Sequence, residues 1–179
     1  GQRLSDQSRA LNTTNESFSL TALSDPLPPG TVLSMTATAP DGSTSEFSAC
    51  FFLDPPPLVV NSSADPGTGT CDATECTLRE AIAAVNARAE DSESVITFAI
   101  PGSGELMVEP NSPLPTISRR VLIDGYSQAG ASPNTEASTS NAVVRLRLHG
   151  ANAGTSASGF SVCADHVSIR GFSITGFAS

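Results

Sequence analysis

Residues 71–82 read CDATECTLREAI, and they place two of the four cysteines and three acidic residues at the clearest helix signal in the chain. Thr77 and Glu80 stand at the spacing of a capping box. In that motif the threonine hydroxyl accepts a hydrogen bond from the backbone N–H of the glutamate, and the glutamate side chain accepts one from the N–H of the threonine. This local pairing predicts that a helix begins directly after Thr77.

The residues that follow continue at helical spacing. Leu78, Ile82 and Val85 recur with the period of one helix face, so they predict an apolar side that packs against the rest of the fold. Arg88 falls in the last expected turn, where a positive charge suits the negative end of a helix. We therefore expect a helix over 78–88.

The four cysteines allow three fully paired arrangements, and their spacing does not select one of them. Cys71 and Cys76 flank a short turn and are the natural pair, with reduced and buried thiols as the alternative. Two thiols without a nearby histidine or further cysteine make a poor zinc site. A disulfide would indicate an oxidising, extracytoplasmic setting. A bridge between Cys50 and Cys163 stays open.

Short β-branched or aromatic runs separated by turns follow the expected helix. Several runs end in the pattern x-Ile/Leu-x-Gly, as at Gly125 and Gly176. Repeats of roughly twenty residues that each supply strands and a tight turn favour a parallel β-helix. A short strand is also expected in the segment that begins at Leu58. The later strands are expected over 95–100, 105–110, 120–125, 143–150, 160–163, 167–171 and 172–177.

Residues 1–53 form a different region. Strand-like alternation covers 18–23, 31–39 and 44–52, and the last two runs are expected to form a hairpin around an Asp-Gly turn. Because a β-sandwich needs about seven strands, these residues are expected to be the C-terminal part of an immunoglobulin-like β domain. Three consecutive prolines then indicate a stiff linker over 54–57, followed by a second domain over 58–179.

The overall charge excludes some classes of partner. The net charge is −9, and the nine basic residues are all arginines that form no basic run, so the phosphate backbone of a nucleic acid would be repelled. No stretch reaches the roughly 18 apolar residues that a membrane span requires. The chain starts without methionine and ends within a strand-like pattern, so we interpret it as a segment of a longer protein.

The stretch VVNSSADPGTGTCDATECTLREAIAAVNA (59–87), with the later segments ITFAIPGSG, SPLPTI and VLIDGYSQAG, resembles the CSLREA domain. That domain stands at the start of right-handed parallel β-helices in large secreted or surface-attached bacterial proteins. The match runs over 58–177, and Thr77 replaces the serine of the motif, a change that a capping role tolerates. The resemblance implies a β-helix and an extracytoplasmic location, and it brings no catalytic residue to this chain.

A looser likeness concerns the segment PLPPGTVLSMTATAPDGSTSEFSAC (26–50), which looks like the C-terminal hairpin of immunoglobulin-like repeats that accompany such β-helices. A solenoid leaves strand edges and apolar surface uncovered at its first turn, and the helix over 78–88 is suited to cover them. The expected fold class is mainly β: a partial immunoglobulin-like β-sandwich followed by the N-terminal turns of a right-handed parallel β-helix with one capping α-helix.

Asp65, Asp72 and Glu75 are weak candidates for a calcium site, because calcium takes several hard oxygen ligands. Their spacing matches no EF-hand or nonapeptide calcium repeat, so a solvated acidic loop is the preferred interpretation. No other metal site and no cofactor are expected.

Arg145, Arg147 and His149 alternate along one expected strand and therefore share a face. This face is a candidate for binding an anionic sugar, and a solvated ladder of arginines is the preferred alternative. Hydrolases of carbohydrates need a close pair of carboxylates, whereas the nearby acids, Asp124 and Asp165, stand singly. We expect no catalytic residue in this region.

These patterns lead to two hypotheses. The first is a non-enzymatic structural and adhesive segment of a large secreted or surface-attached bacterial protein, which displays a β-helix surface to a carbohydrate or a cell-surface partner. The alternative is the N-terminal part of a carbohydrate-active β-helix enzyme, a polysaccharide lyase or hydrolase, with its catalytic turns further along the protein. Clustered acids on successive downstream turns would favour the enzyme.

Overall fold

The computed structural model describes residues 32–33, 41–43, 51–52, 54–66, 69–88 and 93–178. The chain divides into two compact units, Gly1–Leu53 and Asp54–Ser179. The described residues are mainly strand, with parallel sheets and one α-helix, so the expectation of a mainly β chain is confirmed.

In the first unit, β1 (Val32–Leu33) pairs antiparallel with β2 (Phe51–Phe52). The turn that precedes β2 in the sequence contains Asp41, whose carboxylate accepts hydrogen bonds from the amide and the hydroxyl of Ser43 at 2.9 and 2.6 Å. The antiparallel pair agrees with the expected hairpin at its two described ends. The expected strand over 18–23 lies outside the described residues.

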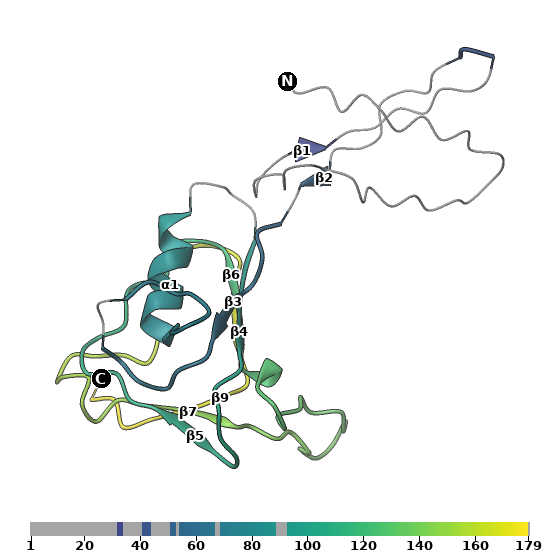
Figure 1. Ribbon diagram of the computed structural model, residues 1–179. Coiled ribbons are helices and arrows are strands. Elements are labelled where there is room, and N and C mark those ends of the chain that lie inside the picture. The colour runs from purple at the N-terminus through teal and green to yellow at the C-terminus, as the bar shows by residue number, and fades with distance from the viewer. Residues whose placement is uncertain are drawn as a thin grey trace. The chain divides into compact units, whose positions relative to one another are not determined.

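The second unit contains two parallel sheets, and after two successive strands in the first sheet the chain alternates between them (Figure 1). The first sheet has the order β3-β4-β6-β8 and the second the order β5-β7-β9. Each visit to a sheet adds a strand beside the previous one, so successive turns of chain stack. The strands are β3 (Leu58–Val60), β4 (Ser94–Phe98), β5 (Leu106–Val108), β6 (Val121–Asp124), β7 (Leu146–His149), β8 (Val167–Arg170) and β9 (Phe172–Thr175).

The helix α1 (Leu78–Ala87) follows β3, and a 3-10 turn, η1 (Gly125–Ser127), follows β6. The helix ends one residue before the expected end, because Arg88 has an extended backbone and donates its N–H to the carbonyl of Val85. The expected strand over 160–163 is wrong: it is reduced to an isolated parallel bridge between Val162 and Ile117.

Residues 54–57, expected as a linker, belong to the second compact unit. Pro55 is buried, and the carbonyl of Pro56 accepts a hydrogen bond from the guanidinium of Arg88 at 3.2 Å. Arg88 also donates to the hydroxyl of Ser94 at 2.9 Å. Arg88, which was expected to interact with the negative end of the helix, therefore connects residues 54–57 to the first residue of β4.

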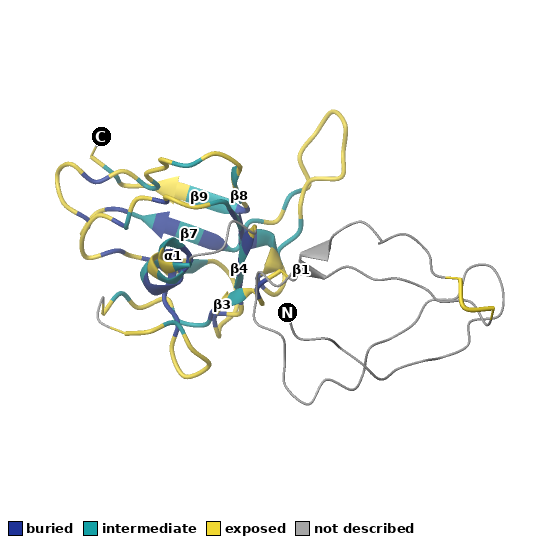
Figure 2. Cartoon of the chain, turned by 90° about the horizontal axis from the view of Figure 1, so that it is seen from above, coloured by how far each residue is buried: buried dark blue, intermediate teal, exposed yellow. Residues whose placement is uncertain are grey.

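The core consists of side-chain rows that run from strand to strand, because parallel pairing places equivalent positions side by side. Leu58, Ile96, Ile123 and Ile169 form one such row across the first sheet. In the second sheet, Leu148 is fully buried whereas its neighbour on β9 is 49% exposed. Figure 2 shows the same loss of burial from β7 to β9, so the last strands have less cover than the middle ones.

Glycines at the corners explain the repeated x-Ile/Leu-x-Gly endings. A Cβ atom at Gly125 would meet the carbonyl oxygen of Gly171 at 2.5 Å, and Gly171 itself has a φ of +77°. Asp124 pairs with Arg170 in the strand register directly before these two glycines. Stacked corners thus approach so closely that a side chain has no room.

Polar side chains form hydrogen bonds with the backbone at the corners between strands. The side-chain amide of Gln128, 3% exposed, accepts from the N–H of Ile100 and donates to its carbonyl, both at 2.9 Å. The Ser127 hydroxyl accepts from the N–H of Phe98 at 2.7 Å. These side chains bond the backbone that follows β4 as a neighbouring strand would, so polar backbone groups inside the fold keep partners.

Candidate functional site

The loop before α1 is closed by a disulfide between Cys71 and Cys76, as expected. Cys76 is fully buried, and its N–H donates to the side-chain oxygen of Asn61 at 2.7 Å. The Asn61 amide in turn donates to the carbonyl of Ala73 at 3.2 Å. The bridged loop is therefore fastened to the residue directly after β3, and it sets where the chain enters the helix.

After cleavage of the chain at Glu75, peptide mapping without reductant should recover Cys71 and Cys76 in one linked fragment. The same digest after reduction should release two fragments, which serves as the internal control. Free thiols at both positions in material prepared without reductant would contradict the bridge, and they would remove the support it lends to an oxidising compartment.

Both hydrogen bonds of the capping box are present. The Thr77 hydroxyl accepts from the N–H of Glu80 at 3.3 Å, and the Glu80 carboxylate accepts from the N–H of Thr77 at 2.9 Å. The second carboxylate oxygen accepts from the N–H of Gly69 at 2.9 Å. Glu80 therefore also holds the loop that contains Gly69. The spacing of residues within the helix does not predict this contact.

Replacing Thr77 and Glu80 together by alanine should lower the free energy of unfolding by about 1–2 kcal/mol, the usual cost of losing a helix cap. The Glu80→Ala change should account for the larger share, since it leaves the N–H groups of both Thr77 and Gly69 without acceptors. Urea unfolding followed by circular dichroism measures both effects. An unchanged unfolding midpoint for the double variant would contradict a helix start at this position.

Arg79 is the centre of a polar clamp that spacing alone did not predict. Its guanidinium binds both carboxylate oxygens of Asp65, at 2.7 and 2.8 Å, and donates to the carbonyls of Ser112 and Pro113, each at 2.8 Å. Asp65 also accepts from the backbone N–H of Asn111 at 2.7 Å. The clamp joins three segments: the loop after β3, the first turn of α1 and the chain after β5.

The ionisation of Asp65 follows from this environment. Burial alone would raise its pKa, but the hydrogen bonds from Arg79 and Asn111, together with the charge of Arg79, outweigh burial and lower the pKa below 3.8. The side chains are 5% exposed for Asp65 and 14% for Arg79. Asp65 is therefore held as a carboxylate whose charge depends on its arginine partner.

The three calcium candidates do not converge on one centre. Asp65 is occupied by Arg79, while Asp72 accepts from the backbone N–H groups of Thr74 and Glu75 at 2.7 and 3.2 Å. The Glu75 carboxylate accepts from the Ser62 hydroxyl at 3.2 Å. Within the part of the chain that the structure describes, no group of three or more metal-ligating side chains occurs. These acids organise the loop through hydrogen bonds.

The predicted apolar face of α1 lies in the core. Leu78, Ile82 and Val85 are each 1% exposed, and they share one hydrophobic cluster with residues of both sheets. In Figure 1 the helix lies beside the first sheet, on the side toward the second. The helix thus fills space between the sheets at the start of the stack.

Asn86, another residue that spacing did not single out, covers a strand-like edge. Its amide donates to the carbonyl of Thr116 at 2.8 Å and accepts from the N–H of Ser118 at 2.9 Å. On the opposite side, Ile117 bonds Ser161 and Cys163 of the next turn through its own N–H and carbonyl. The side chain of Asn86 therefore occupies the place of a preceding strand. The sequence does hold one signal for this role. Asn86 stands seven residues after Arg79, which places both side chains on the same side of the helix.

The arginine face predicted on β7 is only partly available. Arg147 pairs with Glu105 at 2.9 Å, and His149 bonds the Thr175 hydroxyl at 3.1 Å. Arg145, just before the strand, donates to the carbonyl of Gly130 at 3.1 Å. The alternation does place Arg147 and His149 on the outer side of the strand, away from buried neighbours. Each member is already engaged with protein groups.

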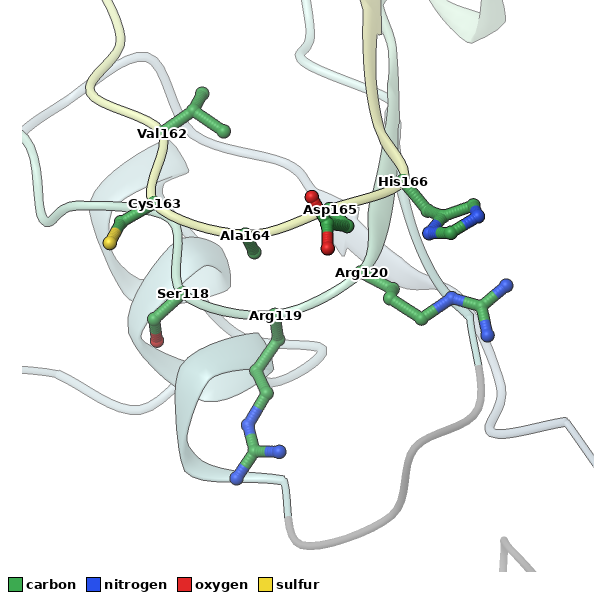
Figure 3. Close-up of a pocket in the computed structure, with 8 residues that line it drawn as sticks. All are labelled: Ser118, Arg119, Arg120, Val162, Cys163, Ala164, Asp165 and His166. Carbon is green, nitrogen blue, oxygen red and sulfur yellow. The ribbon is translucent and has the colours of Figure 1, made fainter.

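A groove of about 680 Å³ lies elsewhere, between segments 118–120 and 162–166 of two successive turns (Figure 3). The Ile117–Val162 bridge fixes one end, and the pairing of β6 with β8 begins at the other. Figure 3 shows Arg119 and Arg120 extending from the first segment. Neither guanidinium has a hydrogen-bond or ion-pair partner among the described residues, and the Nε atom of Arg120 is buried.

The second segment of the groove carries Cys163, Asp165 and His166. Cys163 is an exposed free thiol, so it forms no bridge to Cys50, a residue that lies outside the described part of the chain. Figure 3 shows Cys163 and His166 at opposite ends of the segment, so they do not form a thiol–imidazole pair. The groove presents positive charge and hydrogen-bonding groups. Its cysteine lacks the adjacent histidine base that would activate a thiol as a nucleophile.

Comparison with known proteins adds no assignment: no protein-family model, curated protein or solved structure matches this chain. A search of the described residues for a helix long and apolar enough to cross a membrane finds none.

Proposed function

We propose that this chain is a non-enzymatic structural and adhesive segment of a large secreted or surface-attached bacterial protein. Its second unit would be the start of a right-handed parallel β-helix that is capped by α1, and the outer surface of the stack would contact carbohydrate or a cell-surface partner. The resemblance of 59–87 to the CSLREA domain supports the same role and location.

The observation that carries the proposal is the set of contacts between α1 and residues 112–118 near the start of the stack. The chain alternates between two parallel sheets, which is how a solenoid is built. At the first turn, Arg79 and Asn86 bond the backbone of 112–118 from the helix side, where a further strand would otherwise pair. A helix bound to one side of the stack at its start, with successive strands added afterwards, is suited to an extended, repetitive display surface.

The surface chemistry favours display over catalysis. Two acids on the outer faces are held by arginines: Asp124 accepts both hydrogen bonds of Arg170 at 2.9 Å, and Glu105 pairs with Arg147. The hydrogen bond from Arg170 lowers the pKa of Asp124, so it stays ionised and is a poor general acid.

A glycan-array screen of the full-length protein, followed by product analysis of every glycan that binds, tests the proposal. We expect retention of one or more carbohydrates with no change in their length. Shortened chains or new unsaturated ends would indicate the carbohydrate-active alternative. A complete lack of retention on the array would contradict an adhesive role toward carbohydrate.

A further inference from the structure

We propose that the groove between segments 118–120 and 162–166 binds an acidic polysaccharide, with Arg119 and Arg120 as the residues that contact its carboxylates. The inference rests on the proposed adhesive function and names the class of ligand. It concerns a different surface from the arginine face predicted on β7.

The charge distribution singles out this groove. Other described arginines already have protein partners, including Arg79 on Asp65, Arg147 on Glu105 and Arg170 on Asp124. The guanidinium groups of Arg119 and Arg120 have none among the described residues, and they are adjacent in a chain of net charge −9. A guanidinium presents a planar fork of donors that matches a carboxylate, so among the described arginines these two groups are available to bind an anion.

The backbone that presents the arginines is held in place. The carbonyl of Arg120 accepts from the N–H of Ser94 at 3.2 Å, and the N–H of Cys163 donates to the carbonyl of Ile117 at 2.8 Å. His166 closes the second segment in a left-handed conformation with a φ of 58°. Both walls are therefore parts of the stacked fold, and their spacing is set before a ligand arrives.

The groove suits a polysaccharide better than other polyanions. A single-stranded nucleic acid is held by aromatic side chains that stack on its bases as well as by positive charge, and this lining contains no Phe, Tyr or Trp. Peptides that bind by strand addition or as amphipathic helices need an exposed strand edge or an apolar groove, whereas Val162 and Ala164 are the apolar side chains of this lining. A uronate polymer has one carboxylate per acidic sugar and many hydroxyls, which match an open groove lined mainly by polar side chains.

The test measures binding of the full 179-residue chain to polygalacturonate, with dextran sulfate, neutral dextran and polyglutamate as the other probes. The Arg119→Gln and Arg120→Gln variants should each bind polygalacturonate about ten-fold more weakly, the loss expected for one charge-assisted hydrogen bond. Arg170→Gln is the matched control, because it removes the same charge from an exposed side chain outside the groove. It should stay within about two-fold of the parent chain.

A further variant is expected to strengthen binding. An increase in affinity cannot result from misfolding, so this variant separates a specific effect from a loss of structure. Asp165→Asn removes the carboxylate of the groove, so binding of polygalacturonate should tighten by about two-fold or more. Equal weakening by Arg170→Gln and Arg119→Gln would overturn the inference, because it would indicate general charge attraction. Equal binding of polyglutamate would replace a polysaccharide with an acidic peptide, and preference for dextran sulfate would replace carboxylate with sulfate.

The outcomes also separate this inference from the proposed function. If the array retains glycans but the Arg119→Gln and Arg120→Gln variants bind them unchanged, the groove is not the binding site and the adhesive role still stands. If the array retains nothing and polygalacturonate does not bind, the adhesive role toward carbohydrate fails together with the groove.

Discussion

Replacing Arg79 by methionine should lower the free energy of unfolding of the second unit by about 3 kcal/mol, the low end of the cost of breaking a buried ion pair. Methionine keeps much of the apolar stem of arginine, so the change mainly removes charge and hydrogen bonds. It would leave the carboxylate of Asp65, which is 5% exposed, with the Asn111 N–H in place of three donors. Urea unfolding followed by circular dichroism measures the loss.

The exposed ion pair between Asp124 and Arg170 is the matched control. It has the same two-hydrogen-bond geometry, but the Arg170 side chain is 55% exposed. Arg170→Met should therefore cost no more than about 1 kcal/mol, because water replaces the lost partner. Similar costs for the two substitutions would mean that burial of the Asp65–Arg79 pair has little energetic consequence.

Acid provides a second check on Asp65. Its folded-state pKa lies below the ordinary value of 3.8, so the stabilisation is present above pH 3.8 and is lost as the pH falls through the lower, folded-state pKa. In the Arg79→Met variant, burial would instead raise the pKa of Asp65. The difference in stability between parent and variant should therefore shrink as the solution is acidified. A difference that does not change with pH would contradict this account of the clamp.

Replacing Ile82 by alanine should lower the free energy of unfolding by about 3 kcal/mol, because deletion of a fully packed aliphatic group removes burial and leaves a cavity. Ile82 is 1% exposed and belongs to the core cluster. The neighbouring Ala83 is exposed on the same helix, so Ala83→Ser should change stability by no more than about 0.5 kcal/mol. Thermal and urea unfolding of the two variants and the parent give the comparison.

The contrast between these two positions tests the capping contact itself. If α1 lay on the surface without packing into the core, Ile82→Ala and Ala83→Ser would both change the free energy of unfolding only slightly. A large effect at Ile82 alone means that one face of the helix is part of the core that the sheets enclose. Leu78→Ala should behave like Ile82→Ala, since Leu78 is also 1% exposed on the same face.

Several elements of this protein could be predicted from neighbouring residues. Thr77 and Glu80 determine the helix start because both partners of the capping box lie within one helical turn. Cys71 and Cys76 are separated by five positions, and their bridge spans one short loop. The apolar period of Leu78, Ile82 and Val85 predicts the buried helix face for the same reason: each signal is contained in a few consecutive residues.

Contacts between distant segments required the tertiary structure. Asp65 looked like a calcium ligand, but folding brings it to Arg79 and to Asn111, which is 46 residues away in sequence. Asn86 meets Thr116 and Ser118 across 30 and 32 residues. No local spacing encodes such partners, because they depend on which segments become neighbours when the two sheets stack.

The candidate binding surfaces show the same division. Alternation along β7 correctly indicated that Arg147 and His149 share an outer face, but the strand pattern does not reveal that Glu105 and Thr175 engage them. The adjacent pair Arg119 and Arg120 was visible in the sequence, and only the stacking of two turns places it beside segment 162–166. Local order therefore determined the helix, its cap and the disulfide. Strand stacking decided which charges are neutralised and which remain available, since charge pairing depends on distance in space and not on separation along the chain.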